Sequence, residues 1–255
     1  MSDLELATHA AHEAGKLLRK HFGGDKVVDE ASDHDIKLAL DKESQDLITT
    51  ILLGAREGDA LYGEEGIAGN QASSRQWIVD PIDGTRDFVR GRRGWSVSVA
   101  LVEGGRTVVG VLDAPARDEH WAAAVGEGAT LNGVPIQAST RAALSGARVP
   151  ADILPKGDLD LVMVEKPNSI ALRMAMVANG EADLLAAMRW GHEWDIAAAA
   201  LIAEEAGATV TDALGRKLRF NSTKGEMFGV LACAPGIHAA AVKRLASRAA
   251  TAVVR

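Results

Sequence analysis

The sequence predicts a protein of mixed α and β structure, with an α+β N-terminal part and an α/β C-terminal part. Three observations predict it: two helical patterns at the start of the chain, strand patterns joined by short turns between residues 77 and 136, and alternating strands and helices after residue 160. Strands that follow one another directly favour an antiparallel sheet, whereas strands that alternate with helices favour α/β layers.

The composition is that of a globular protein and excludes several classes. The 255 residues are 47% hydrophobic and 25% charged, and the formal net charge is −7. We expect no binding of nucleic-acid polymers or anionic membranes over a broad surface. Cys233 is the only cysteine, so no internal disulfide can form and a reducing compartment, the cytoplasm, is expected. The acidic N-terminus is unlike a signal peptide, and no apolar run is long enough to span a membrane.

Two helices are expected first. Apolar residues recur at helical spacing over residues 4–18, and the run stops at Gly23 and Gly24. A second pattern places Ser44 together with the apolar residues Leu47, Ile48, Ile51 and Leu52 on one face, with Asp41 at its expected N-terminus. As an N-cap, Asp41 would accept a hydrogen bond from the first helical turn, which is a purely structural role.

Strand patterns occupy the residues that follow. The apolar residues 60–62 lead into Gly-Glu-Glu-Gly at 63–66, a tight loop that could aim a carboxylate into a site but that could also be a solvated loop. The alternation over residues 95–102 predicts a half-buried strand with partners near 108–112 and 121–125, and Asn132-Gly133 predicts a hairpin. We expect an antiparallel sheet, flanked by the two helices.

The C-terminal part alternates between helix and strand. Helices are expected over residues 169–179 and after Trp194-Asp195, with stops at Gly180 and Gly207. Ser169 and Asp195 stand at the helix starts, where each could be no more than a cap. The remaining elements are short strands at 161–164, 209–211 and 229–232 and a last helix over about 236–250.

The chemistry centres on residues 77–88, Trp-Ile-Val-Asp-Pro-Ile-Asp-Gly-Thr-Arg-Asp-Phe. An apolar strand delivers Asp80 and Asp83 across a turn set by Pro81 and Gly84. Two carboxylates held together repel unless a cation lies between them, so a metal site of oxygen ligands is predicted. The backbone N–H groups after Gly84 could cradle an anion. A cation site beside an anion site indicates phosphate chemistry, although a capped turn would explain an isolated motif of this kind.

In order along the chain, these motifs resemble those of the inositol monophosphatase superfamily of metal-dependent phosphatases. The matching segments are Gly-Glu-Glu at 63–65, Asp-Pro-Ile-Asp-Gly-Thr at 80–85, and Trp-Asp at 194–195 followed by a helix ending at Gly207. The resemblance implies a layered α-β-α-β-α sandwich with two or three Mg²⁺ ions at the junction of its halves. We place the junction near residue 140, with a metal-binding domain over 1–140 and a domain over 141–255 that supplies Asp195 and substrate contacts.

The resemblance also implies a role for each matching residue. Glu64, Asp80 and the Ile82 carbonyl would hold one metal, and Asp80 would bridge to a second metal held by Asp83 and Asp195. Thr85, hydrogen-bonded to Asp41, would orient with Glu64 the water that attacks phosphorus. The N–H groups of Gly84 and Thr85 would hold the phosphate oxygens. Oxygen ligands of this kind suit Mg²⁺, and the two-metal arrangement needs no covalent intermediate.

Two subgroups of the superfamily compete for the substrate. Asp-Gly-Thr-Arg-Asp-Phe at 83–88 and Glu-Trp-Asp at 193–195 look more like the CysQ group, which removes the 3′-phosphate of 3′-phosphoadenosine 5′-phosphate. Arg173 stands near the position where that group has a lysine that would meet a second phosphate, and Ser169 is a secondary candidate for substrate binding. Arg173 could equally be an exposed helix residue. Other CysQ signatures are absent, so inositol 1-phosphate or another sugar phosphate remains the alternative.

A non-catalytic relic that kept the fold and binds a metal or an anion is a remote alternative. It predicts loss of at least one of the five principal residues, and all five are present: Glu64, Asp80, Asp83, Thr85 and Asp195. The expected partner is a small phosphorylated substrate, with no nucleic-acid polymer and no membrane. The resemblance also implies that a homodimer would be ordinary.

Overall fold

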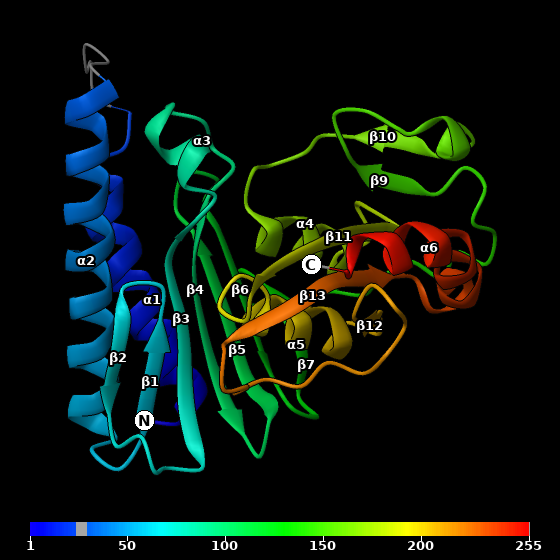
Figure 1. The fold of residues 1–255 in the computed structure, drawn as a ribbon. Helices are drawn as coiled ribbons and strands as arrows, with labels where there is room; N and C mark the ends of the chain where they lie inside the picture. Colours follow the sequence, from blue (N-terminus) through cyan, green and yellow to red (C-terminus); the bar gives the residue numbers. More distant parts are fainter. Residues whose placement is uncertain (24–29, 255) are drawn as a thin grey trace.

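The computed structural model describes residues 1–23 and 30–254, with the backbone alone for residues 30–37. The described elements form five layers, alternately helical and β (Figure 1). The first layer holds α1 (Asp3–Arg19) and α2 (Glu30–Ala55), the third holds α4 (Ile170–Ala178) and α5 (Ala197–Glu205), and the fifth holds α6 (His238–Ala252). A large sheet and a small sheet lie between them, so the predicted layered sandwich is confirmed. Among the described helices, none is long and apolar enough to cross a membrane.

Of the described strands, eight form the large sheet in the order β2-β1-β3-β4-β5-β6-β7-β8. Their bounds are β1 (Ala60–Gly63), β2 (Gly66–Gly69), β3 (Arg75–Asp83), β4 (Ser96–Glu103), β5 (Arg106–Ala114), β6 (Glu119–Ala124), β7 (Gly128–Leu131) and β8 (Val134–Pro135). The expected antiparallel sheet is corrected at one pair, because β1 and β3 are parallel. The β1–β2 hairpin places β2 on the outer side of β1, so the returning chain adds β3 on the other side.

The second part of the chain builds the small sheet and a separate strand pair. β11 (Leu184–His192), β13 (Glu226–Cys233) and β12 (Thr209–Thr211) pair antiparallel in that order, while β9 (Arg148–Pro150) and β10 (Val162–Val164) pair parallel. Short helices complete the elements: α3 (Thr85–Val89), η1 (Lys156–Asp158) and η2 (Pro235–Ile237). The large sheet ends at Pro135, but α5 packs on it from the second part, and the division into domains near residue 140 stays a prediction.

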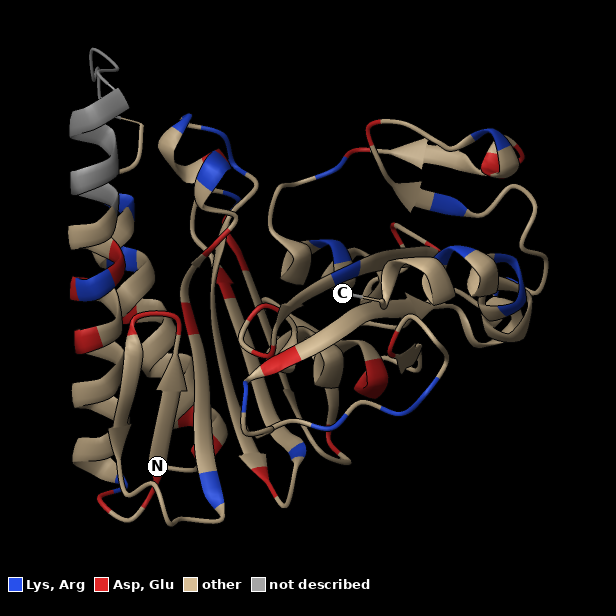
Figure 2. Ribbon diagram, in the orientation of Figure 1, with Lys and Arg blue, Asp and Glu red and all other residues tan. Residues whose placement is uncertain are grey.

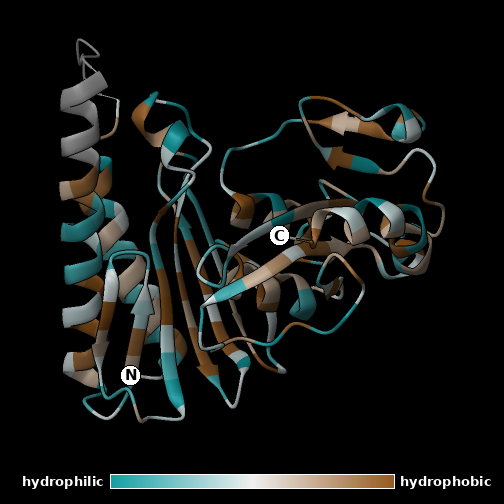
Figure 3. Cartoon of the chain, viewed as in Figure 1, coloured by the Kyte–Doolittle hydropathy of each residue, from teal (hydrophilic) through white to brown (hydrophobic). Residues whose placement is uncertain are grey.

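Within the described part of the chain, three large apolar clusters and one small one lie between the layers. α1 and α2 bury alanines and leucines against one face of the large sheet, α4 and α5 cover its other face, and α6 covers the small sheet. Figure 3 shows the hydrophobic runs along the central strands and the hydrophilic turns at their ends. Gly110 lets α5 approach β5 closely, since a Cβ there would lie 2.5 Å from the Ala198 carbonyl oxygen. The alanine-rich start of α5 therefore rests directly on β5.

An ion pair between Arg148 and the buried carboxylate of Asp183 joins β9 to the start of β11. Asp183 accepts hydrogen bonds from Arg148 Nε (2.9 Å) and Nη2 (2.8 Å). Burial alone would raise the pKa of Asp183, but the bonds from Arg148 outweigh it and lower the pKa to about 2. The strand pair β9–β10 is thereby tied to the small sheet.

Two expected helix starts are wrong. α2 begins at Glu30, so Asp41 lies in the helix interior and is not an N-cap. The chain from residue 30 to Asp41 has no glycine or proline, so nothing in it stops the helix from extending toward the N-terminus. α5 begins at Ala197, and Asp195 instead accepts a hydrogen bond from the His192 N–H in the turn before the helix (3.1 Å). Ser169 is the predicted N-cap of α4, and its hydroxyl accepts from the Leu172 N–H.

Candidate active site

Asp80 and Asp83 lie where β3 leaves its regular pairing with β4. The register shifts between these two residues, and Pro81 removes one backbone donor from the ladder. The Asp80 carboxylate accepts a hydrogen bond from the Ile82 N–H (2.9 Å) and is 2% exposed. The irregular end of the strand therefore brings both carboxylates to one place, as the sequence predicted.

Asp83 also joins the large sheet to α4. Its carboxylate accepts hydrogen bonds from the Ser169 hydroxyl, the Ala171 N–H (2.8 Å) and the Ile170 N–H (3.3 Å). This connection could not be predicted from the sequence. Because the first N–H groups of a helix lack partners within the helix, Asp83 and Ser169 together cap α4. The start of α4 is thus fixed beside the carboxylates.

The turn before α5 positions Asp195. Glu193 is fully buried and accepts hydrogen bonds from the N–H groups of Asn221 (2.6 Å) and Ser222 (2.9 Å). The Trp194 ring packs against Tyr62 of β1, with 5.0 Å between ring centroids. The Glu-Trp-Asp segment is therefore held from both sides, and Asp195 is directed toward Asp80 and Asp83.

The three aspartates form a cluster in which one carboxylate oxygen of each lies within 4.8 Å of the others. Burial raises the pKa of Asp80 well above its usual value, and the Asp83, Glu64 and Asp195 carboxylates add to the effect. Burial, followed by the Asp195 carboxylate, raises the pKa of Asp83 to about 7, and burial also raises that of Asp195. Like charges held this close out of water require protons or a cation. The all-oxygen set fits Mg²⁺, which prefers carboxylates and carbonyls.

Glu64 lies beside the cluster but outside the group within 4.8 Å. It belongs to the exposed turn between β1 and β2, and its charge adds to the raised pKa of Asp80. Gln45 of α2 fixes this turn, because its side chain accepts from the Glu65 N–H (2.9 Å) and donates to the Gly66 carbonyl (3.3 Å). Asp41, one turn earlier on the helix, is fully buried. Sequence reasoning missed Gln45, although its spacing of four residues from Asp41 would have placed it on the same face.

Gly84 and Thr85 follow the cluster as predicted. Gly84 has φ +90° and precedes the short helix α3. A Cβ on Gly84 would lie 2.5 Å from the Gly94 carbonyl oxygen and 2.8 Å from the Ser169 nitrogen, so only glycine fits. The Thr85 hydroxyl donates to the Ile82 carbonyl (2.9 Å). The expected bond between Thr85 and Asp41 stays a prediction.

A cavity of about 450 Å³ opens beside Asp83 and Asp195, and Gly84 and Thr85 also line it. Four cationic side chains line the same cavity: Arg86, Lys166, Arg173 and Arg189. In Figure 2 the end of β3 is acidic, while α3 and the start of α4 carry basic residues. The cavity therefore combines a place for cations with a strongly positive wall.

The four cations differ in how they are held. Arg173 donates to the Ser169 and Asn168 carbonyls (both 3.2 Å), which fixes its guanidinium, and burial lowers its pKa. Lys166 pairs with Asp152. Arg86 and Arg189 are exposed, and no carboxylate of the described residues pairs with them. Arg173 was predicted for this site; Lys166 and Arg189 were not, because only the fold brings them beside the aspartates.

Fold and site together define a class: a layered α/β protein with an aspartate cluster that could hold a divalent cation, beside a cavity lined by cationic side chains. Comparison with known proteins then gives the family. The model of the inositol monophosphatase family matches residues 2–255. The chain therefore belongs to the inositol monophosphatase family of phosphatases.

Individual relatives agree with this assignment. A fructose-1,6-bisphosphatase/inositol-1-monophosphatase of Thermotoga maritima is 34% identical over 85% of this chain and 87% of its own. A histidinol-phosphatase of Chlorobaculum parvum is also 34% identical, over 84% and 87%. The solved structure of an inositol monophosphatase from Anabaena has a TM-score of 0.80 at 26% identity and covers 96% of this chain and 95% of its own. The names of these relatives differ in substrate, and they do not confirm the CysQ subgroup.

Proposed function

We propose that this chain hydrolyses a small phosphate monoester with two or three bound Mg²⁺ ions, and that its preferred substrate carries a second phosphate. The first candidate is 3′-phosphoadenosine 5′-phosphate, in keeping with the CysQ-like residues at 83–88 and 193–195. The observation that carries the proposal is a buried aspartate cluster beside a cavity with four cationic side chains. We also propose a cytoplasmic location and a homodimer.

The ligands in this proposal are Asp80, Asp83, Asp195, Glu64 and the Ile82 carbonyl. Bound Mg²⁺ would activate water as the nucleophile and neutralise the leaving oxygen. The Ile82 oxygen accepts the Thr85 hydroxyl with one lone pair and has a second available for a cation. The protein's own part is to hold these oxygens in fixed positions.

The remaining residues would orient the water and the phosphate. Glu64 and Thr85 would orient the attacking water, with Asp41 holding Thr85 in place. The N–H groups of Gly84 and Thr85 would bind the phosphate oxygens, since they begin a helix and lie on the cavity wall. Ser169 would act indirectly, because its hydroxyl is committed to Asp83 and to the cap of α4.

The positive wall distinguishes among substrates. An arginine guanidinium has five N–H donors, and the carbonyls of Ser169 and Asn168 occupy two donors of Arg173, so others can bind an anion. A second phosphate would meet Arg173 and Arg189, whereas the ammonium of histidinol phosphate would be repelled by them. Inositol 1-phosphate would leave these charges unused. A sugar bisphosphate would pair its second phosphate with these charges, and the Thermotoga maritima relative is named as a fructose-1,6-bisphosphatase as well as an inositol-1-monophosphatase.

Rates of phosphate release would test this proposal. The substrates are 3′-phosphoadenosine 5′-phosphate, fructose 1,6-bisphosphate, inositol 1-phosphate and histidinol phosphate, each assayed with Mg²⁺ and with EDTA. We expect the two bisphosphates to be preferred, and EDTA to abolish release. Arg189→Ala should raise KM about tenfold for the preferred bisphosphate, or about 1.4 kcal/mol, with inositol 1-phosphate unaffected. Arg90→Ala, an exposed arginine that does not line the cavity, is the matched control.

Each other outcome has a distinct meaning. If inositol 1-phosphate is preferred, the second-phosphate proposal is wrong and the inositol alternative holds. If histidinol phosphate is preferred, the positive wall does not set specificity. If no ester is hydrolysed, the chain is a non-catalytic relic of its family.

A further inference from the structure

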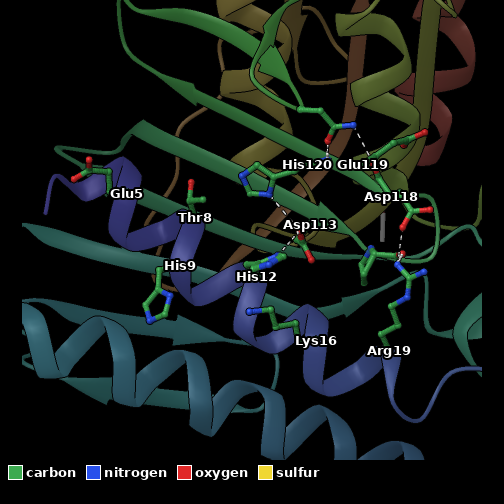
Figure 4. Close-up of a pocket in the computed structure, with 12 residues that line it drawn as sticks. Glu5, Thr8, His9, His12, Lys16, Arg19, Asp113, Asp118, Glu119 and His120 are labelled. Carbon is green, nitrogen blue, oxygen red and sulfur yellow. Dashed lines mark hydrogen bonds and ion pairs between the residues drawn. The ribbon is translucent and has the colours of Figure 1, made fainter.

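A second cavity, of about 700 Å³, lies between α1 and the β5–β6 hairpin (Figure 4). It shares no lining residue with the candidate active site. Three potential metal ligands from three different elements meet in it: His12 of α1, Asp113 of β5 and His120 of β6. Nothing in the proposed phosphatase chemistry uses them.

The two imidazoles face the same carboxylate oxygen. The Nδ1 atom of His120 lies 3.2 Å from Asp113 Oδ1, and the Nδ1 atom of His12 lies 3.6 Å from the same oxygen. In Figure 4 the two rings approach Asp113 from the helix side and from the strand side. The second distance is too long for a good hydrogen bond, so His12 is near Asp113 without a direct bond to it.

The cluster is incompletely satisfied as it stands. Asp113 is 4% exposed, and within the described part of the chain neither its Oδ2 nor the His120 Nε2 has a hydrogen-bond partner. The neighbouring cations are engaged elsewhere, because Lys16 pairs with Glu13 (2.8 Å) and Arg19 with Asp118 (2.7 Å). A buried carboxylate that lacks a full set of partners is unfavourable unless a cation completes it.

The distances from the two imidazole nitrogens to Asp113 Oδ1 are close to those between neighbouring ligands around one tetrahedral ion. Zinc bonds of about 2.0–2.1 Å place neighbouring ligand atoms about 3.3 Å apart. The distances of 3.2 and 3.6 Å from Asp113 Oδ1 lie on either side of this value. We propose that His12, Asp113 and His120 bind one transition-metal ion of the Zn²⁺ type, with water in the fourth position.

Only His12 would need to move. Among the described residues, only the three aspartates of the active site have ligand atoms that all lie within 4.8 Å of one another. The nitrogens of His12 and His120 are therefore farther apart than this, and the two imidazoles must approach each other to bind one ion. The His12 side chain is 55% exposed, so it has space to change its rotamer, whereas His120 is 25% exposed and already hydrogen-bonded to Asp113. Gly15 lets the Asp113 carboxylate lie directly against α1, since a Cβ there would lie 2.0 Å from Asp113 Oδ2.

Imidazole nitrogens select the metal. Two nitrogens and one carboxylate suit Zn²⁺, Co²⁺ or Ni²⁺ better than Mg²⁺, which prefers oxygen ligands. The two metal sites of the chain would therefore have different preferences. The ion would link α1 to the β5–β6 hairpin and would stabilise the fold by binding the native state.

Calorimetric titration of EDTA-treated protein with Zn²⁺, in a buffer with millimolar Mg²⁺ to fill the aspartate cluster, would test this inference. We expect wild-type protein to bind one Zn²⁺ at the histidine site and its melting temperature to rise. His12→Ala and His120→Asn should each weaken that binding about 100-fold and remove the rise. Asparagine at position 120 keeps a donor for Asp113, so the fold should survive.

His21→Ala is the matched control, because His21 is an exposed histidine just after α1 that does not line the cavity. It should bind Zn²⁺ like wild type. A second readout is the visible absorption of bound Co²⁺, whose intensity would report tetrahedral ligation with nitrogen. Equal Zn²⁺ affinity in wild type, His12→Ala and His120→Asn, or no Zn²⁺ bound in the presence of Mg²⁺, would overturn the proposal. Neither result would affect the phosphatase proposal.

Discussion

Replacing Asp83 by asparagine should stabilise the metal-free protein while it removes activity. In the fold the pKa of Asp83 is raised to about 7, first by burial and then by Asp195, whereas in an unfolded chain an aspartate has a pKa of about 3.9. Ionised Asp83 thus costs the metal-free fold about 4 kcal/mol, since one unit corresponds to about 1.4 kcal/mol. The cost is absent below about pH 4, and it grows until the pH passes about 7.

Asparagine avoids this cost but keeps most of the contacts. Its oxygen can accept from the Ser169 hydroxyl and the Ala171 N–H, while its NH₂ group must face the Ile170 N–H, a loss of about 1–2 kcal/mol. The net expectation at pH 8 is a gain of about 2 kcal/mol in the free energy of unfolding without metal. Near pH 4 the gain should give way to the loss of about 1–2 kcal/mol, because Asp83 of the folded wild type is then neutral and the cost of its charge is absent.

Urea denaturation at pH 8 and at pH 4, with EDTA and with Mg²⁺, measures these differences. Mg²⁺ should stabilise the wild type, by about 2.7 kcal/mol at 100 times its Kd, and should have little effect on Asp83→Asn. Phosphate release by the variant should fall to near background. Asp87→Asn is the control, because Asp87 is buried and accepts the Asn168 N–H but is outside the cluster; it should keep the Mg²⁺ response. Wild-type turnover in Asp83→Asn, or an unchanged Mg²⁺ effect, would refute the reasoning.

Three further predictions concern residues around the site and the ion pair between Arg148 and Asp183. Gly84→Ala should lower the free energy of unfolding by roughly 2 kcal/mol or more and abolish phosphate release. Gly91 also has a positive φ but has open space around it, so Gly91→Ala should lower the free energy of unfolding by about 1 kcal/mol and retain activity. Asp183→Asn should lower the free energy of unfolding by about 2 kcal/mol at pH 7. Because the pKa of Asp183 in the folded protein, about 2, is below its value in the unfolded chain, this loss should fade as the pH falls toward 2. Urea denaturation measures both, and the exposed Asp160→Asn is the control, which should show little change at either pH. Gln45→Ala should release the turn that carries Glu64, so kcat should fall about tenfold while KM changes little; an unchanged kcat would show that this turn needs no support.

The sequence predicted that Asp80 and Asp83 lie together because both residues are next to strong local signals. An apolar strand followed by Pro81 and Gly84 fixes where β3 loses its regular pairing, and so where Asp80 and Asp83 project. Ser169 was predicted as a cap because its hydroxyl acts within its own helix turn. The position of Asp195 followed from the resemblance, since a Trp-Asp pair alone says little.

Features that depend on distant contacts were not predictable. Arg189 and Lys166 reach the cavity only because β11 and the segment before α4 come together beside β3. The bond from Ser169 to Asp83 joins residues 86 positions apart. Asp41 was misplaced because a strong capping residue also occurs inside long helices, where burial and not capping decides its role.

The most direct test of the central claim is a crystal structure of the protein grown with Mn²⁺ in place of Mg²⁺, analysed by anomalous scattering. Mn²⁺ accepts the same oxygen ligands, and its anomalous peaks identify the ion without ambiguity. The account predicts at least one peak between the carboxylates of Asp80, Asp83 and Asp195, with peak and ligands about 2.2 Å apart. No peak at this cluster, with the three carboxylates ordered as described here, would contradict the proposal that these residues form the catalytic metal site.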